Sequence, residues 1–292
     1  MPVRTHGAAL AAGVAALFAA LAAPAAAPPP AGASAAGLPV APAPVAVLNV
    51  AGRQRMLIQR ACKAYLMLGQ QIAPPRARAM LDDSIARFEA QLLELSRLAP
   101  SADARAALGK LQLSWREYRA VLTAPPSVAG AQELYLLGEP AQEAAHRLTL
   151  AVERAAPTPA DRLVNVAGRQ RMLAQRMAKY ALFIAWGVQP HAARMELNLA
   201  RSEFSTTMYQ LATGLRNDAI GVQLERLDAE WQAYRPLFDR PLTSAMLADI
   251  AERSERMLDA GETLVSLYER LALAMPAAAR ASGAASGSSG VR

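Results

Sequence analysis

The sequence Asn-Val-Ala-Gly-Arg-Gln-Arg-Met-Leu occurs twice in this chain of 292 residues, at Asn49–Leu57 and again at Asn165–Leu173. The offset of 116 residues continues without a gap far beyond the nine-residue block. Three aromatic residues recur at this offset: Phe88 and Phe204, Trp115 and Trp231, and Tyr118 and Tyr234. A period of this length indicates a duplicated domain rather than a short solenoid repeat. Because packing alone tolerates substitution, the unchanged block predicts that its particular side chains are used.

Helical propensity and regularly spaced breakers predict four helices in each repeat. Ala, Leu, Arg, Gln and Glu dominate the sequence, and few stretches are rich in β-branched residues. The expected helices cover about 45–72, 76–99, 102–123 and 127–156, then about 160–188, 190–214, 217–239 and 243–275. Pro140 predicts a kink or a late start in the fourth helix. The predicted fold class is therefore all-α, with two tandem four-helix bundles of up-down-up-down topology related by pseudo-twofold symmetry.

The two ends of the chain differ in composition from the repeats. Residues 1–35 combine Arg4 with an Ala/Leu/Phe run and a Pro-rich exit of small residues, which is typical of a secretory signal peptide. An uncleaved membrane anchor is the alternative, although the apolar run is short for a span. Residues 36–46 form a Pro/Ala linker, and residues 276–292 form a tail predicted to be disordered. We therefore assign helical domains to 47–156 and 157–275, and expect an exported, periplasmic protein.

The distribution of charge along the chain is more informative about function than the net charge is. The formal net charge is +7, and part of it comes from arginines in the terminal segments. So small an excess argues against a nucleic-acid partner. No acidic residue precedes Asp82, and none lies between Asp161 and Glu196. Both copies of the motif therefore lie in stretches without a carboxylate.

On a helix, the motif forms a seam with alternating spacings of four and three residues, which is the face by which one helix packs against another. The two seams are Leu48, Gly52, Arg55, Gln59, Cys62 and Leu66, and Val164, Gly168, Arg171, Gln175, Ala178 and Leu182. A glycine inside a helix costs stability but permits close approach. A buried arginine without a carboxylate is also costly, and a bound oxyanion would satisfy its planar guanidinium group.

Pairing of the two seams about a pseudo-twofold axis would bring both arginines to one pocket. Two like charges side by side are unfavourable unless an anion lies between them. The candidate ligand-binding residues are Gly52, Arg55, Gly168 and Arg171, together with Asn49 and Asn165 at the start of each motif. A structural salt bridge is the alternative for both arginines.

The pattern Asn-x-Ala-Gly-Arg-Gln-Arg-Met-Leu-x-Gln-Arg resembles the P-box of the NarX/NarQ-type nitrate sensors. It is more similar still to the PilJ-type domain, named for the N-terminal region of type IV pilus chemotaxis transducers. The resemblance covers both copies and nearly all of 47–272. It implies a four-helix bundle and a nitrate site between the first helices of two subunits, at positions that are Gly52/Arg55 and Gly168/Arg171 here. Those sensors carry transmembrane helices on both sides and a signalling module, which are not found here after the signal segment.

The sequence thus predicts a sensory accessory protein that binds a small inorganic anion, with nitrate or nitrite as the expected ligand, between the first helices of its repeats. A membrane sensor or envelope protein is the expected partner. The alternative is a structural or interaction module of the cell envelope that kept the fold without the ligand. Arg53, Arg60, Arg169 and Arg176 form a secondary basic stripe with Lys63 and Lys179, expected to be solvated or paired with acids such as Asp83.

No cofactor, metal site or enzymatic activity is expected. Glu143-Ala-Ala-His146 has the spacing of half a di-iron site, but the second repeat has Asp259-Ala-Gly-Glu262 in its place. No Ser/His/Asp or Cys/His set recurs at equivalent positions of the two repeats. Cys62 has Ala178 as its equivalent, which indicates a small buried hydrophobic residue.

Overall fold

The computed structural model describes residues 44–155 and 158–275, and these ranges form eight α-helices. The first repeat contains α1 (Pro44–Gly69), α2 (Pro74–Leu98), α3 (Ala102–Thr123) and α4 (Val128–Ala155). The second contains α5 (Pro159–Ala185), α6 (Pro190–Thr213), α7 (Asp218–Tyr234), the short 3-10 helix η1 (Arg235–Asp239) and α8 (Ser244–Ala274). The predicted all-α class is confirmed. The predicted signal peptide and tail lie outside the described residues.

The local sequence accounts for where half of the described α-helices begin. The side chains of Ser101, Thr158, Asn217 and Thr243 each accept a hydrogen bond from the backbone N–H three residues later, which caps α3, α5, α7 and α8. Helix α4 runs without interruption through Pro140, so the predicted late start is wrong. Helix α1 begins at Pro44, inside the predicted linker.

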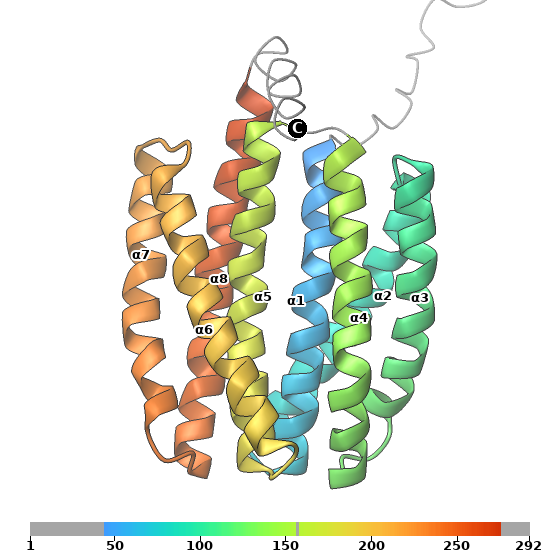
Figure 1. The fold of residues 1–292 in the computed structure, drawn as a ribbon, viewed down its shortest axis with the longest axis vertical. Coiled ribbons are helices and arrows are strands. Elements are labelled where there is room, and N and C mark those ends of the chain that lie inside the picture. The colour runs from blue at the N-terminus through green and yellow to red at the C-terminus, as the bar shows by residue number, and fades with distance from the viewer. Residues whose placement is uncertain (1–43, 156–157, 276–292) are drawn as a thin grey trace, which may run out of the picture. The chain divides into compact units, whose positions relative to one another are not determined.

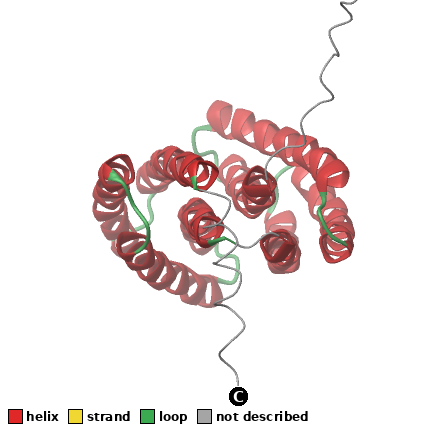
Figure 2. Cartoon of the chain, turned by 90° about the horizontal axis from the view of Figure 1, so that it is seen from above, coloured by secondary structure: helices red, strands yellow, loops and turns green. Residues whose placement is uncertain are grey.

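Helices α1 and α5, which carry the two copies of the motif, lie side by side and run in the same direction (Figure 1). Helices α2 and α4 pack against α1, and α6 and α8 pack against α5. In the view from above, the outer helices surround this central pair (Figure 2). The contact between α1 and α5 joins the repeats, and the described residues of the two repeats form one compact unit.

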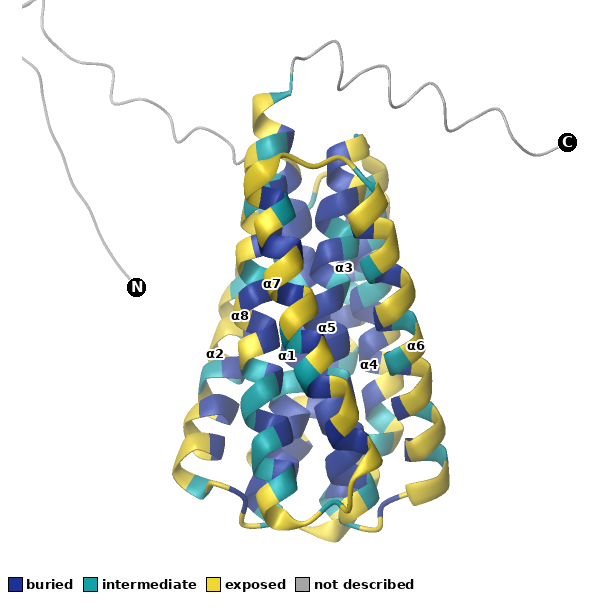
Figure 3. Ribbon diagram, turned by 90° about the vertical axis from the view of Figure 1, so that its left-hand side faces the viewer, coloured by how far each residue is buried: buried dark blue, intermediate teal, exposed yellow. Residues whose placement is uncertain are grey.

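The central helices are buried along nearly their whole length, whereas the outer helices expose one face (Figure 3). Small residues permit this close packing on several sides: Ala51, Ala61 and Ala64 in α1, and Ala167, Ala174, Ala178 and Ala181 in α5. The recurring aromatic residues complete the core of each repeat, with Phe88 stacked on Trp115 and Phe204 against Trp231. The packing of α1 against α5 therefore determines where the side chains of the two identical motifs meet.

None of the helices in the described ranges combines the length and apolarity that crossing a bilayer requires. Within the same ranges, no group of three or more His, Cys, Asp or Glu side chains is placed to hold a metal ion. Cys62 is fully buried, and burial raises its pKa to about 11.

Candidate functional site

The two motif helices exchange a reciprocal pair of hydrogen bonds. Arg55 of α1 donates from Nη2 to Oδ1 of Asn165 in α5, at 2.8 Å. Arg171 of α5 donates from Nη2 to Oδ1 of Asn49 in α1, also at 2.8 Å. Both arginines are only 1% exposed. The motif thus pairs with its own second copy, as the pseudo-twofold arrangement of the seams predicts.

The asparagine side chains are oriented by acids from the fourth helix of each repeat. Asn165 donates from Nδ2 to Oε2 of Glu153, at 2.6 Å. Glu269 of α8 stands at the equivalent position; burial raises its pKa, and its interaction with Asn49 opposes that rise. Each asparagine therefore turns its oxygen toward an arginine of the opposite motif helix. In the structure, Asn49 and Asn165 position the two guanidinium groups.

Gly52 and Gly168 leave room for these guanidinium groups. A Cβ atom on Gly52 would lie 3.3 Å from Nη2 of Arg55, and one on Gly168 would lie 3.2 Å from Nη2 of Arg171. The same Cβ on Gly168 would lie 3.6 Å from Nη2 of Arg55. The arginine side chains fold back over the glycines, and both charges converge at the helix pair. This is the physical reason why a helix-weakening residue stands at these two positions.

Arg171 has a carboxylate partner that the motif helices could not supply. Its Nη1 donates to Oε2 of Glu262 in α8, at 2.6 Å. Arg53 donates to both oxygens of the same carboxylate, at 3.2 and 2.9 Å. For Arg171, the structure thus contains the salt bridge that was the alternative to an anion site. The acid-free sequence around the motif did not exclude an acid from another helix.

Arg55 forms no ion pair with any carboxylate in the described part of the chain. Its strong hydrogen bond goes to the side chain of Asn165. Its two other hydrogen bonds are weak and go to the backbone oxygen of Gly52 at 3.4 Å and to the backbone oxygen of Asn165 at 3.5 Å. Burial, followed by the charges of Arg169 and Arg171, lowers the pKa of Arg55 to about 9. A buried cation that is short of counter-charge is the kind of group that an anion stabilises.

A cavity of about 150 Å³ adjoins Arg55 between α4, α5 and α6. Its basic lining comprises Arg55, His146, Arg169 and Arg176, and its acidic lining comprises Glu139, Glu143 and Glu203. Each of these acids is engaged by a different arginine: Glu203 by Arg169, Glu139 by Arg176, and Glu143 by Arg147. The cation left without a carboxylate at this cavity is therefore Arg55.

His146 is half-buried in the cavity wall, and its pKa is lowered by burial and by the nearby charges of Arg55 and Arg169. Analysis of the sequence missed His146 and Glu262 as members of the site. They occupy equivalent positions at the 116-residue offset. The alignment of Glu143-Ala-Ala-His146 with Asp259-Ala-Gly-Glu262, which argued against a di-iron site, therefore already showed that the repeats differ at this position.

The predicted basic stripe is paired rather than solvated. Arg53 contacts Glu262, Arg60 contacts Asp83 and Glu255, Arg169 contacts Glu203, and Arg176 contacts Glu139 and Glu196. Lys63 is fully buried and contacts Glu255 at 2.7 Å. The stripe thus contributes to packing between helices, because acids of α2, α4, α6 and α8 reach it.

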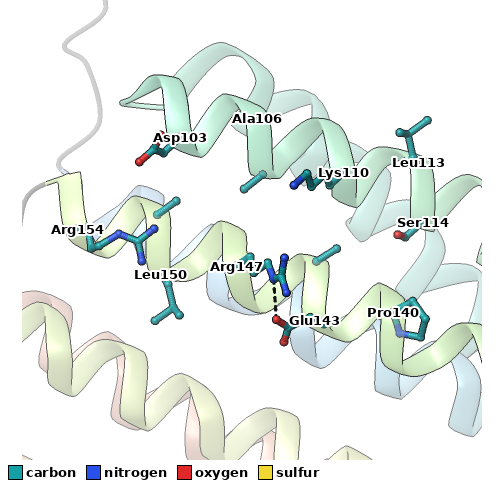
Figure 4. A pocket seen from close by; sticks show the side chains of 13 residues that line it. Asp103, Ala106, Lys110, Leu113, Ser114, Pro140, Glu143, Arg147, Leu150 and Arg154 are labelled. Atoms are coloured by element: carbon teal, nitrogen blue, oxygen red, sulfur yellow. Dashed lines mark hydrogen bonds and ion pairs between the residues drawn. The ribbon is translucent and has the colours of Figure 1, made fainter.

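A larger groove of about 620 Å³ lies between α3 and α4 (Figure 4). Its charged side chains include Asp103, Lys110 and the ion pair of Arg147 with Glu143. These charged groups are exposed, and no motif residue lines the groove. The groove therefore lacks the buried, uncompensated charge that marks the smaller cavity.

The repeats match one protein family twice. Residues 45–137 and 159–257 each match the N-terminal domain of type IV pili methyl-accepting chemotaxis transducers, PilJ. This chain belongs to the PilJ family. PilJ domains are sensory domains of chemotaxis transducers and form a non-enzymatic family, so a sensory role is consistent with the match. No curated protein and no solved structure was found to match the chain.

Proposed function

We propose that this PilJ-family protein is an exported sensory module that binds a small oxyanion at the contact between α1 and α5. Nitrate and nitrite are the proposed ligands. The observation that carries the proposal is Arg55, a guanidinium that is 1% exposed, borders a cavity and has no carboxylate partner among the described residues. Arg171 adds a second positive charge at the same helix pair. Because Glu262 already pairs with Arg171, a bound anion would compensate the charge of Arg55.

Export and signal transmission belong to the same proposal. The composition of residues 1–35 supports passage to the periplasm, and PilJ domains are typically periplasmic. A membrane sensor or an envelope protein would then recognise the anion-bound form of the protein. The central position of α1 and α5 supports this, because a ligand between them would change the packing of both repeats.

Calorimetric titration of the purified protein with nitrate, nitrite and chloride tests the proposal. Replacing Arg55 with Ala removes charge-assisted hydrogen bonds worth about 1.5–3 kcal/mol each. We expect oxyanion binding to weaken by about ten- to a hundredfold at 1.4 kcal/mol per decade. Arg87→Ala is the matched control, because Arg87 is exposed and pairs with Asp83 four residues before it.

Equal affinity of the wild type and Arg55→Ala for an oxyanion would place the binding site elsewhere. Absence of oxyanion binding by the wild type at millimolar concentration would favour the alternative, an envelope interaction module that kept the fold without the ligand.

A further inference from the structure

The two repeats place different residues at equivalent positions around the central arginines. At the 116-residue offset, His146 of α4 corresponds to Glu262 of α8, and Glu203 of α6 corresponds to Arg87 of α2. The motif residues themselves are identical in the two copies. The environment of Arg55 therefore differs from that of Arg171 through residues outside the motif.

On the side of Arg171, Glu262 occupies the position that a small anion would take. Its Oε2 accepts from Nη1 of Arg171 at 2.6 Å and from Nη2 of Arg53 at 2.9 Å. Its Oε1 accepts from Nε of Arg53 at 3.2 Å. A planar, singly charged oxyanion thus bridges Arg171 of one copy of the motif and Arg53 of the other. The protein supplies that anion from its own chain.

On the side of Arg55, the corresponding carboxylate is missing. His146 stands where Glu262 stands, and Glu203 compensates Arg169, the equivalent of Arg53. Among the described residues, no carboxylate lies within ion-pair distance of Arg55, although Glu153 and Glu203 act on its charge from farther away. The cavity of about 150 Å³ opens beside it. Gln142 also lines this cavity and is 6% exposed. Its oxygen accepts from Gln59, which leaves its amide N–H groups to donate.

We propose that the duplicated site is used only once: Glu262 permanently fills the Arg171 side, and the Arg55 side binds one external anion of the same chemistry as that carboxylate. The inference rests on the proposed function and adds the location, number and class of ligand. One unmatched positive charge selects a monovalent anion. Because the carboxylate of Glu262 is a planar oxyanion, we expect the equivalent position beside Arg55 to bind planar oxyanions as well. Formate and acetate are therefore proposed ligands in addition to nitrate and nitrite. The cavity is too small for the usual drug-sized ligand, whose pockets span about 300–1,000 Å³.

Reciprocal substitutions on the full chain test this assignment. His146→Glu places a carboxylate beside Arg55, and Glu262→Gln removes the one beside Arg171. Each variant is titrated calorimetrically with nitrate, nitrite, formate, acetate, chloride and sulfate, and its thermal midpoint is measured without added anion. Gln132→Glu is the matched control, because it adds the same charge on an exposed position of α4 away from the cavity.

We expect the wild type to bind one planar monovalent anion per chain and to prefer it to chloride and sulfate. His146→Glu should weaken binding at least tenfold and raise the thermal midpoint, whereas Gln132→Glu should change neither. Glu262→Gln should lower the thermal midpoint, and added nitrate should restore part of the loss through a second bound anion.

Two bound anions in the wild type, or unchanged affinity in His146→Glu, would overturn the single-site inference while the proposed function stands. Retained binding of one anion by Glu262→Gln, with no restoration of its stability by nitrate, would show that Glu262 does not substitute for a ligand. Failure of the wild type to bind any of the anions would overturn both proposals. The circular dichroism spectrum of each variant verifies that it is folded.

Discussion

At the scale of single residues, Arg55 and Arg171 share the same nine-residue neighbourhood in sequence and have different environments in space. Arg171 contacts Glu262 at 2.6 Å, whereas Arg55 relies on the neutral oxygen of Asn165. Removing a guanidinium from water is costly unless its charge is compensated. The pKa of both arginines is lowered by burial, and Glu262 opposes this shift only at Arg171. We therefore expect an external anion to bind at only one of the two copies.

Gly52→Ala tests the role of the glycine without removing a charge. The new Cβ would lie 3.3 Å from Nη2 of Arg55 and would push the guanidinium away from Asn165. The gain in helix propensity, about 0.5–1 kcal/mol, offsets part of that loss. We therefore expect a small change in the free energy of unfolding and a severalfold loss of nitrate affinity, measured by urea titration and calorimetry.

Gly109→Ala is the control for this substitution, since nothing lies within 4 Å of a Cβ added at Gly109 in α3. It should stabilise the fold by about 0.5–1 kcal/mol and leave nitrate affinity unchanged. Unaltered nitrate affinity in Gly52→Ala would show that the close contact with Arg55 does not shape the site.

At the scale of helices, each motif helix is tied to the fourth helix of the other repeat. Lys63 of α1 contacts Glu255 of α8 at 2.7 Å, and Ser254 accepts from the same ammonium group at 2.7 Å. At the equivalent positions, Lys179 of α5 lies 3.7 Å from Glu139 of α4. Glu139 also accepts from Arg176 and Tyr180. We expect these polar contacts between helices to fix the register between the repeats, since apolar packing alone would permit sliding.

Glu255→Gln should destabilise the fold by about 3 kcal/mol, because it leaves the buried Lys63 without its carboxylate. Urea unfolding followed by circular dichroism measures the loss. The matched control is Glu252→Gln on the same helix, whose partner is the exposed Arg76. The control should cost less than about 1 kcal/mol. Equal losses in the two variants would contradict a special role for the buried pair.

The same carboxylate makes stability depend on pH in the acid range. Burial opposes ionisation of Glu255, but Lys63 and Arg60 outweigh it and lower its pKa to about 2 from the ordinary 4.5. Since the folded-state pKa is depressed, the stabilisation is complete above pH 4.5 and is lost as pH falls from there toward 2. The shift corresponds to about 3 kcal/mol. Urea unfolding at several pH values should show a shallower acid loss in Glu255→Gln than in the wild type.

At the scale of the whole molecule, the contact between α1 and α5 makes the repeats depend on each other. Neither motif helix has a solvent-exposed side along most of its length. Separating the repeats would expose the apolar surface of both helices together with the buried arginines. We therefore expect the described residues of both repeats, which form one compact unit, to unfold cooperatively in spite of their origin as a duplication.

Single-tryptophan variants test this cooperativity. With Trp186 replaced by Phe, Trp115→Phe leaves Trp231 to report on the second repeat, and Trp231→Phe leaves Trp115 to report on the first. We expect, in each variant, that fluorescence and circular dichroism give coincident urea midpoints, which is the signature of two-state unfolding. Separate transitions for the two probes would show that the repeats unfold independently.

The amino-acid sequence alone was sufficient to predict the duplication and the helix boundaries to within a few residues. Periodicity, breakers and caps act locally, so they can be read along the chain. It also predicted that the two motif seams would meet, because an apolar face with a glycine and an arginine at its centre needs a partner.

The way in which the charges of that seam are compensated could not be predicted without the folded structure. Glu262, Glu203 and Glu255 are far from the motifs along the chain, and helix packing brings them to the arginines and to Lys63. Electrostatic compensation depends on distance in space and on burial, which no local pattern encodes. For this reason the two identical motifs predicted a symmetric pocket, whereas the folded chain pairs Arg171 with Glu262 and leaves Arg55 beside the cavity.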